Sequence, residues 1–177
     1  FMKKLSKLSK IFLFLAVLSA IIWVGSAVTR QLITYQLFEG PELNFKPYVT
    51  EQNLSGIYET ILPAVTITFV SYCVFIISFI VFLITARINL KHFGWLFIIM
   101  IIVFILMPFE IYLMTIDFKI ISLLNSGNFD TNIITNFILS RFKVLSSFTL
   151  IEILCYLAFV YFILFRPLQV IPKQDEN

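Results

Sequence analysis

The sequence predicts an all-α, polytopic membrane protein with four transmembrane helices and a helical hairpin that projects from the outer side of the membrane. Of the 177 residues, 60% are hydrophobic and only 13% are charged, whereas soluble domains carry about 25% charged residues. The mean hydropathy is +0.98. Four long apolar runs are continuous rather than alternating, which favours membrane-spanning helices over barrel strands.

The apolar runs divide a single transmembrane domain, residues 1–177, into four spans at about 11–29, 58–86, 93–117 and 144–165. Each span is close to the roughly 20 residues that a helix needs to cross the hydrocarbon core. The first span follows a lysine-rich start and contains Gly25-Ser26-Ala27, which resembles a signal-peptidase cleavage site. We expect this span to be retained as a membrane anchor.

The segment between the first two spans is the largest hydrophilic surface. The first helix meets no breaker before Phe38, and Gly40-Pro41 is expected to stop it. An outer loop of about residues 39–56 leads to the second helix, which is expected to begin near residue 57 and to hold Pro63 in its first two turns. Partner docking is predicted at the acidic and aromatic residues of this loop, namely Glu39, Glu42, Phe45, Tyr48 and Glu51.

The third and fourth spans are expected to continue as helices beyond the bilayer. The third would run on to residue 124, a turn would form the hairpin tip at about 125–130, and one helix would run from about residue 131 to Phe165. Asp130 or Thr131 is suited to cap that helix. Arg166-Pro167 ends it, and residues 167–177 are predicted to be a flexible tail.

Basic residues predict the orientation. Five lie on the side away from the termini: Arg30, Lys46, Lys119, Arg141 and Lys143. Eight lie on the side of the termini: Lys3, Lys4, Lys7, Lys10, Arg87, Lys91, Arg166 and Lys173. The positive-inside rule therefore places the N- and C-termini in the cytoplasm. A basic start followed by an apolar anchor is typical of a protein of the bacterial inner membrane.

The residue inventory offers little for catalysis or cofactors. His92 is the only histidine, so paired haem ligands are excluded within the chain and a zinc site is not expected. Cys73 and Cys155 lie near the middles of two spans, where small core thiols are expected rather than a disulfide. No nucleophile–base motif, phosphate loop or nucleic-acid patch is present. We expect no cofactor apart from bound lipid, and the inventory leans against an enzyme.

Two carboxylic acids within the spans, Glu110 and Glu152, are the main candidates for function, because charged groups at that depth cost at least about 2–3 kcal/mol. No lysine or arginine lies in any span, so we expect neither acid to have a basic partner within the chain. Helical rise places them about 10 Å apart in depth, which disfavours a shared proton. The polar neighbours expected around them are Tyr112 and Tyr156, and Pro108 is expected to kink the helix before Glu110.

Three interpretations of these acids stay open: neutral, hydrogen-bonded groups that hold helices together, groups that pair with a neighbouring subunit, and groups that carry protons or cations. The leading functional hypothesis is a small accessory subunit, a four-helix bundle within a larger membrane complex, with other membrane-protein subunits and lipid as partners and no nucleic acid. The alternative is a proton- or cation-conducting component, expected to be a homo-oligomer. A second alternative is an enzyme acting on lipid near Glu39, Glu42, Glu51 or Glu59.

Overall fold

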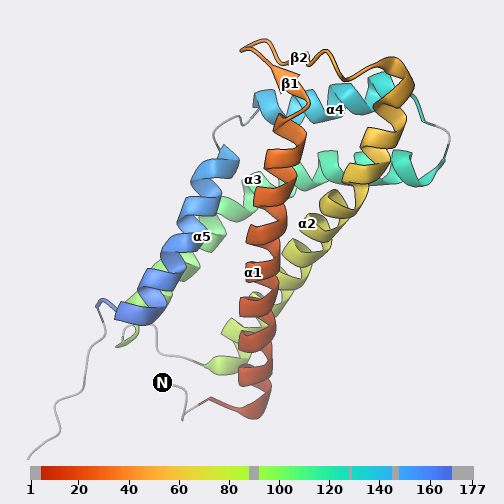
Figure 1. Cartoon of the computed structure of the whole chain (residues 1–177). Helices are drawn as coiled ribbons and strands as arrows, with labels where there is room; N and C mark the ends of the chain where they lie inside the picture. The colour runs from red at the N-terminus through yellow and green to blue at the C-terminus, as the bar shows by residue number, and fades with distance from the viewer. Residues whose placement is uncertain (1–4, 88–91, 128, 145–147, 169–177) are drawn as a thin grey trace, which may run out of the picture.

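The described part of the chain forms five helices and a short β-hairpin (Figure 1). The computed structural model describes residues 5–87, 92–127, 129–144 and 148–168. Four of its helices are long and apolar enough to cross a membrane: α1 (Lys7–Tyr35), α2 (Glu51–Ala86), α3 (Gly94–Asn125) and α5 (Phe148–Phe165). The fifth helix, α4 (Thr131–Val144), is shorter and less apolar. The predicted all-α class with four spans is therefore confirmed, and the chain is an integral membrane protein.

The four long helices give the bundle two distinct ends. The end where α1 begins and α5 finishes is called the terminal end, and the opposite end, where α1 finishes and α2 begins, is called the loop end (Figure 1). The helix α1 begins at the terminal end after Ser6, whose Oγ accepts a hydrogen bond from the amide of Ser9 at 3.1 Å. Such a cap satisfies one of the amides that lack partners in a first turn.

The loop end is more ordered than the sequence predicts. The helix α1 stops at Tyr35 rather than at Phe38, and the next residues form an antiparallel pair of short strands, β1 (Phe38–Glu39) and β2 (Asn44–Phe45). The rings of Phe38 and Phe45 stack with centroids 5.1 Å apart. This packing of one ring on the other stabilises a hairpin that is too short to be recognised from residue alternation.

The helix α2 begins at Glu51, six residues before the predicted start. The side chain of Asn53 accepts a hydrogen bond from the amide of Thr50 at 2.8 Å, which is one half of a capping box. The predicted outer loop of residues 39–56 is therefore too long, and Glu51 lies in the first helical turn. Pro63 consequently lies in the interior of a 36-residue helix, not in its first two turns.

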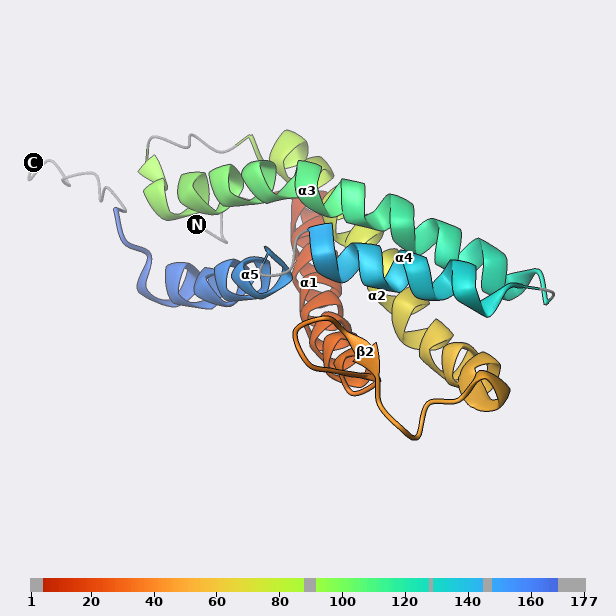
Figure 2. The same cartoon turned by 90° about the horizontal axis from the view of Figure 1, so that it is seen from above.

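The predicted hairpin is present at the loop end. The helix α3 ends at Asn125, Gly127 adopts a left-handed backbone with φ of 71°, and α4 begins at Thr131 after Asp130, whose Oδ1 accepts the amide of Asn132 at 2.8 Å. Viewed from above, α4 lies beside the C-terminal half of α3, and the two helices reach sideways beyond α1 (Figure 2). The hairpin lies across the loop end of the bundle.

The prediction of one helix from residue 131 to Phe165 is wrong. The helix α4 ends at Val144, and α5 starts at Phe148 and runs down the bundle in a different direction from α4 (Figure 1). Contacts of α4 with α3 favour this change of direction more than helix propensity favours one continuous helix. Most of the predicted flexible tail, residues 169–177, lies outside the described residues. Before it, the carbonyl of Leu168 accepts the amide of Gly94 at 3.3 Å, so the end of α5 is joined to the start of α3.

Apolar side chains gather in two clusters. The larger cluster fills the bundle between α1, α2, α3 and α5 around Trp23, Tyr72 and Phe82. The smaller cluster lies at the loop end, where α4 packs on α2 and α3 around Leu113 and Ile134. Four buried charged side chains lie where the two clusters meet and begin the candidate site: Arg30, Glu110, Asp117 and Glu152.

Candidate functional site

A buried ion pair joins α1 to α3. Arg30 donates two hydrogen bonds to Asp117, from Nη1 to Oδ2 at 2.8 Å and from Nη2 to Oδ1 at 2.6 Å. The Arg30 side chain is 10% exposed and that of Asp117 is 1% exposed. Such a bidentate pair is the strongest arrangement of arginine and a carboxylate, because the two planar groups form two parallel N–H···O hydrogen bonds. The pair fixes the position of α1 along α3.

Arg141 brings the hairpin helix α4 into the same network. Its Nη1 lies 2.9 Å from Oδ2 of Asp117, and its Nη2 lies 3.5 Å from Oε1 of Glu110. Burial, and next the charge of Arg30, lower the pKa of Arg141, whereas the charges of Asp117 and Glu110 raise it. An arginine nevertheless stays protonated in proteins. Two guanidinium groups from α1 and α4 therefore face two carboxyl groups from α3.

The spacing of residues along α3 explains why both of its acids face the network. Glu110 and Asp117 are seven residues apart, or two helical turns, so their side chains leave the helix on the same face. Leu113 and Ile120 alternate with them on that face and are also buried. The acids are thus part of the packed face of α3 and do not point to lipid.

Glu152 of α5 is the third acid of the network. It is fully buried, and it has no basic partner among the described ion pairs. Its electrostatic neighbours include Glu110 and Arg141. Phe109 precedes Glu110 by one residue on α3, and Phe148 precedes Glu152 by one turn on α5. Their rings lie 4.9 Å apart and hold α5 against α3 at the level of the two glutamates. Three carboxyl groups therefore share a site with two permanent cations.

An aromatic layer lies below Glu152 on the side of the terminal end. The Trp23 ring lies 4.8 Å from that of Tyr156 and 5.3 Å from that of Tyr72. Both tyrosines interact electrostatically with Glu152. Tyr156 follows Glu152 by one turn on α5, so the two side chains share a face. The polar side chains therefore form a column, which runs from the Arg30–Asp117 pair through Glu110 and Glu152 to this aromatic layer.

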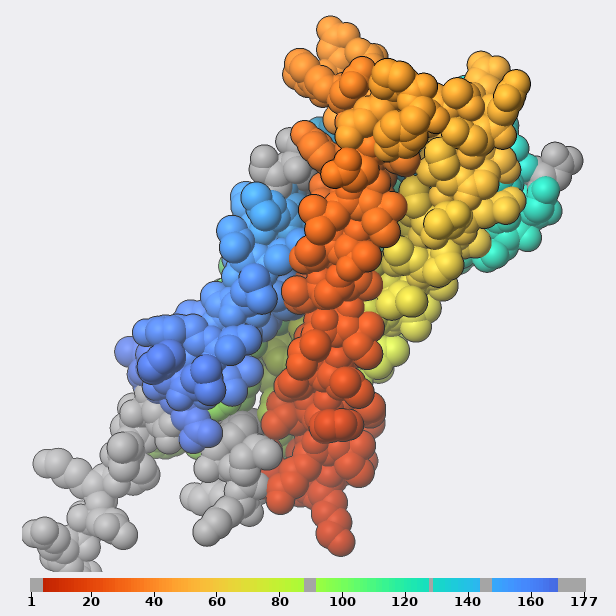
Figure 3. Space-filling model, in the orientation of Figure 1, coloured from red at the N-terminus to blue at the C-terminus, as the bar shows by residue number. Residues whose placement is uncertain are grey.

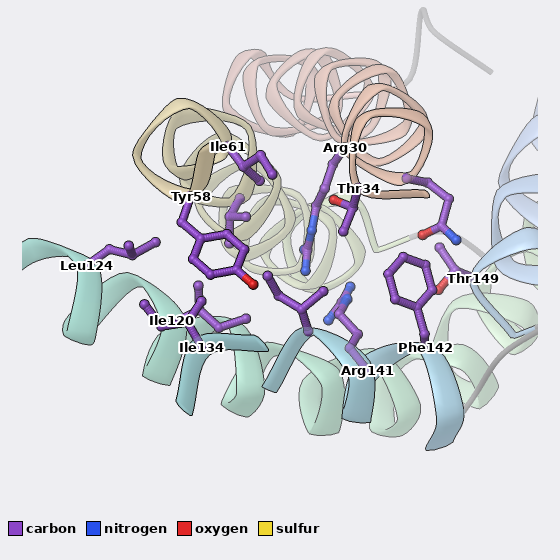
Figure 4. A pocket seen from close by; sticks show the side chains of 13 residues that line it. Arg30, Thr34, Tyr58, Ile61, Ile120, Leu124, Ile134, Arg141, Phe142 and Thr149 are labelled. Carbon is purple, nitrogen blue, oxygen red and sulfur yellow. The ribbon is translucent and has the colours of Figure 1, made fainter. Parts of the chain in front are cut away.

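A small cavity of about 30 Å³ opens beside the two arginines (Figure 4). Arg30 and Arg141 point toward one another across it, and Tyr58, Thr34 and Phe142 form parts of its wall. Tyr58 is held in place by a hydrogen bond with the hydroxyl of Thr135. A space of this size and polarity has room for one or two water molecules. Water in it would lie against the side chains of Arg30 and Arg141.

The structure corrects two predictions about the glutamates. Glu110 has a basic partner within the chain, because Arg141 reaches it from α4, which lies outside the spans. Glu110 and Glu152 interact rather than lie about 10 Å apart in depth. Both errors arise from treating residues 131–165 as one helix: with α4 turned across the bundle, Arg141 lies against α3 and α5 starts beside Glu110.

The other predicted site residues divide into two groups. Tyr156 is buried next to Glu152, whereas Pro108 and Tyr112 lie on the exposed side of α3, away from the network. Among the predicted docking residues, Phe45 is half-buried against Phe38. The remaining four are exposed at the loop end: Glu39, Glu42, Tyr48 and Glu51.

Sequence reasoning missed Arg30, Asp117 and Arg141, because it assigned all three to the solvated ends of helices. A signal was present for Asp117, since its seven-residue spacing from Glu110 places both on one helical face. No comparable local pattern marks Arg30, which is 87 residues from its partner in the sequence.

Among the described residues, no group of three or more His, Cys, Asp or Glu side chains is arranged to hold a metal ion. Cys73 and Cys155 are free and half-buried. Comparison of the chain with protein-family models, with curated proteins and with solved structures gives no match. The class that the fold and the site define is an integral membrane protein of four long apolar helices with an internal ionic network.

Proposed function

We propose that the chain is a small accessory subunit of a larger membrane complex and that it binds its partner through the loop end. The observation that carries this proposal is the preorganised acidic loop, residues 36–53, which presents exposed carboxylates on a fixed backbone. Preorganisation favours binding because less conformational freedom is lost when the partner arrives.

Hydrogen bonds hold the acidic loop in one conformation. The Tyr48 hydroxyl donates to the carbonyl of Gln36, and Lys46 Nζ donates to the Gln36 side chain at 3.0 Å. Asn53 Nδ2 donates to the carbonyl of Tyr48 at 2.8 Å, and the amide of Lys46 donates to the carbonyl of Leu37 at 3.0 Å. These bonds tie the loop to the end of α1 and to the start of α2.

The charges of the acidic loop are available to a partner. Glu39, Glu42 and Glu51 are exposed, and among the described residues none of the ion pairs involves them. Glu110 and Asp117, in contrast, form ion pairs within the chain, so these two buried acids do not need a basic residue from another subunit. A partner with a basic surface at the membrane boundary fits this arrangement.

The orientation is part of the same proposal. Arg30 and Arg141 form ion pairs with buried acids, so they do not add positive charge to the surface of the loop end. The cations that remain at that surface are Lys46, Lys119 and Lys143. We place both termini in the cytoplasm of a bacterial cell, with the acidic loop on the outer side.

The test is purification in mild detergent followed by mass spectrometry of what co-purifies. The triple variant Glu39→Gln/Glu42→Gln/Glu51→Gln should lose a stoichiometric partner while its thermal stability is unchanged. Glu59→Gln, an exposed acid two turns further along α2 than Glu51, is the matched control and should keep the partner. Recovery of the native chain without any partner, or an equal effect of the control, would contradict the proposal.

A second function, proton conduction, is favoured by one observation, the fully buried Glu152, which interacts with Glu110 and has no basic partner among the described ion pairs. Two guanidinium groups neutralise two of the three carboxylates, so electroneutrality in this site requires one bound proton. In that role Glu152 and Glu110 hold the proton and the small cavity beside the arginines supplies water.

Proton flux into vesicles that contain the purified chain tests this function. Under a pH gradient read with an internal dye, Glu152→Gln should abolish the flux that Glu59→Gln leaves intact. Absence of flux in the native chain would exclude conduction.

A further inference from the structure

An apolar groove runs along the terminal half of the bundle between α1 and α5. Its volume is about 540 Å³. The surfaces of α1 and α5 separate toward the terminal end, and α3 is visible between them (Figure 3). One wall is the α1 face from Leu13 to Val24, and the other is the α5 face from Tyr156 to Arg166. Phe75, Phe79 and Phe82 of α2 and Trp95, Leu96 and Ile99 of α3 complete the lining.

The groove has the length of one leaflet of a bilayer. Leu13 and Val24 are eleven residues apart, which corresponds to about 16 Å of helix, and Tyr156 and Arg166 are ten apart, or about 15 Å. The hydrocarbon core of a bilayer is about 30 Å thick, so one leaflet contributes about 15 Å. A chain that enters at the terminal end and reaches Tyr156 would therefore extend to the middle of the membrane.

The volume of the groove suits an acyl chain. Apolar cavities of about 150 Å³ accommodate benzene, so a groove of about 540 Å³ has room for a full alkyl chain. Membrane interiors are close-packed, so the groove is filled when the protein is in a bilayer.

Cations stand at the open end of the groove. Arg166 lines it directly at the end of α5 and is exposed. Lys10 precedes Leu13 by three residues and is exposed on the same face of α1. The sequence has no acidic residue in 5–38, 60–109 or 153–168, the segments that build this half of the bundle. Among the described residues, a phosphate at the mouth would therefore meet the positive charges of Arg166 and Lys10 and no acidic side chain of these segments.

We propose that the groove binds one acyl chain of an anionic phospholipid from the leaflet at the terminal end, with the phosphate against Arg166 and Lys10. Leu13, Val17 and Ala20 contact the chain from α1, and Leu157, Val160 and Ile163 contact it from α5. Tyr156 closes the groove in the middle of the membrane. The site is separate from the acidic loop, so it does not depend on the accessory role proposed above.

Native mass spectrometry of purified protein tests this site. The probes are palmitoyl-oleoyl phosphatidylglycerol and phosphatidylcholine, titrated separately after delipidation. We expect one tightly held phosphatidylglycerol for each chain and weaker binding of phosphatidylcholine. Lys10→Gln/Arg166→Gln should weaken phosphatidylglycerol roughly tenfold and phosphatidylcholine much less, because two interfacial cations are lost and the phosphate of phosphatidylcholine is balanced by its own choline. Lys119→Gln/Lys143→Gln, a pair of exposed cations at the loop end, is the matched control and should change neither lipid.

Filling the groove gives the second arm of the test. Ala20→Phe should abolish the tightly held lipid, and Val17→Trp, at a 42% exposed position, should do the same without disturbing the core. Leu18→Phe, at an equally exposed position of α1 outside the groove, should leave binding intact. Equal binding of both lipids that no groove variant changes would overturn the proposal, and so would a disulfide-linked dimer of the Val17→Cys variant.

Discussion

Replacement of Asp117 by asparagine should destabilise the fold more than any other isosteric change in the bundle. Asp117 is the only residue that contacts both Arg30 and Arg141 among the described ion pairs. The new amide keeps the shape of the carboxylate but has no charge, and its N–H groups would face guanidinium N–H groups. Arg30 and Arg141 would then be two buried cations that share Glu110 as their nearest carboxylate.

The magnitude follows from the burial of the pair. Removing one partner of a buried ion pair costs about 3–5 kcal/mol, because the remaining charge stays away from water. The Asp117 side chain is 1% exposed and that of Arg30 is 10% exposed, so solvent screens the pair little. At about 1.4 kcal/mol for each factor of ten, we expect the folding equilibrium to fall by roughly two to four orders of magnitude.

A double-mutant cycle separates the pair from its surroundings. Asp117→Leu and Arg30→Met should each be strongly destabilising, whereas the double variant Arg30→Met/Asp117→Leu should recover most of the loss, since Arg141 keeps Glu110 as a partner. Unfolding in mixed micelles of mild detergent and dodecyl sulfate, followed by tryptophan fluorescence, reports the change through Trp23, which is 1% exposed. Lys143→Met, at an exposed position of α4, is the control and should fall within about 0.5 kcal/mol of the native protein. A loss below about 1 kcal/mol for Asp117→Asn would refute the buried network.

Three further changes test other parts of the structure. Gly94→Ala would place a Cβ 2.7 Å from the Cβ of Leu168, so we expect faster hydrogen exchange in the last turn of α5, whereas Gly56→Ala, which meets nothing within 4 Å, should leave exchange there unchanged. Asn53→Ala removes the bond to the Thr50 amide and should cost about 1 kcal/mol in micelle unfolding, with neighbouring Gln52→Ala as a neutral comparison. Tyr58→Phe removes the hydroxyl that meets Thr135 and should also cost about 1 kcal/mol; an unchanged midpoint would mean that α4 does not depend on this bond.

The parts of the fold that sequence predicts are those that depend on local composition. A run of about 20 apolar residues must be helical in lipid whatever it packs against, so four spans follow directly from hydropathy. The hairpin between α3 and α4 follows from a local signal as well, since Asn125-Ser-Gly127 interrupts two helical patterns and Asp130 offers a cap.

The parts that sequence does not predict depend on contacts between distant residues. The turn of α4 across the bundle is such a case, because Arg141 finds Asp117 and Glu110 only after the chain has reversed. The pairing of Arg30 with Asp117 is another, because both look like ordinary charged residues near the ends of helices. A hydropathy average over a long window hides single charges of this kind. Helical periodicity identifies only Glu110 and Asp117, because these two acids share a face of α3.

The position of the network within the bundle bears on the choice between the two proposed functions. The acids and arginines lie in the half toward the loop end, and the aromatic layer of Trp23, Tyr72 and Tyr156 separates them from the terminal half. Buried hydroxyls beyond or beside that layer already donate to carbonyls of their own helices: Ser71 bonds Ile67 at 2.6 Å and Ser19 bonds Leu15 at 2.6 Å.

A proton that crossed the bundle would have to break these bonds or pass through the phenylalanines of α2. The ion pairs of Arg30 and Arg141 with Asp117 and Glu110 hold α1, α3 and α4 together at the loop end. A bundle fixed in this way beside the acidic loop suits a rigid docking subunit better than a conductor.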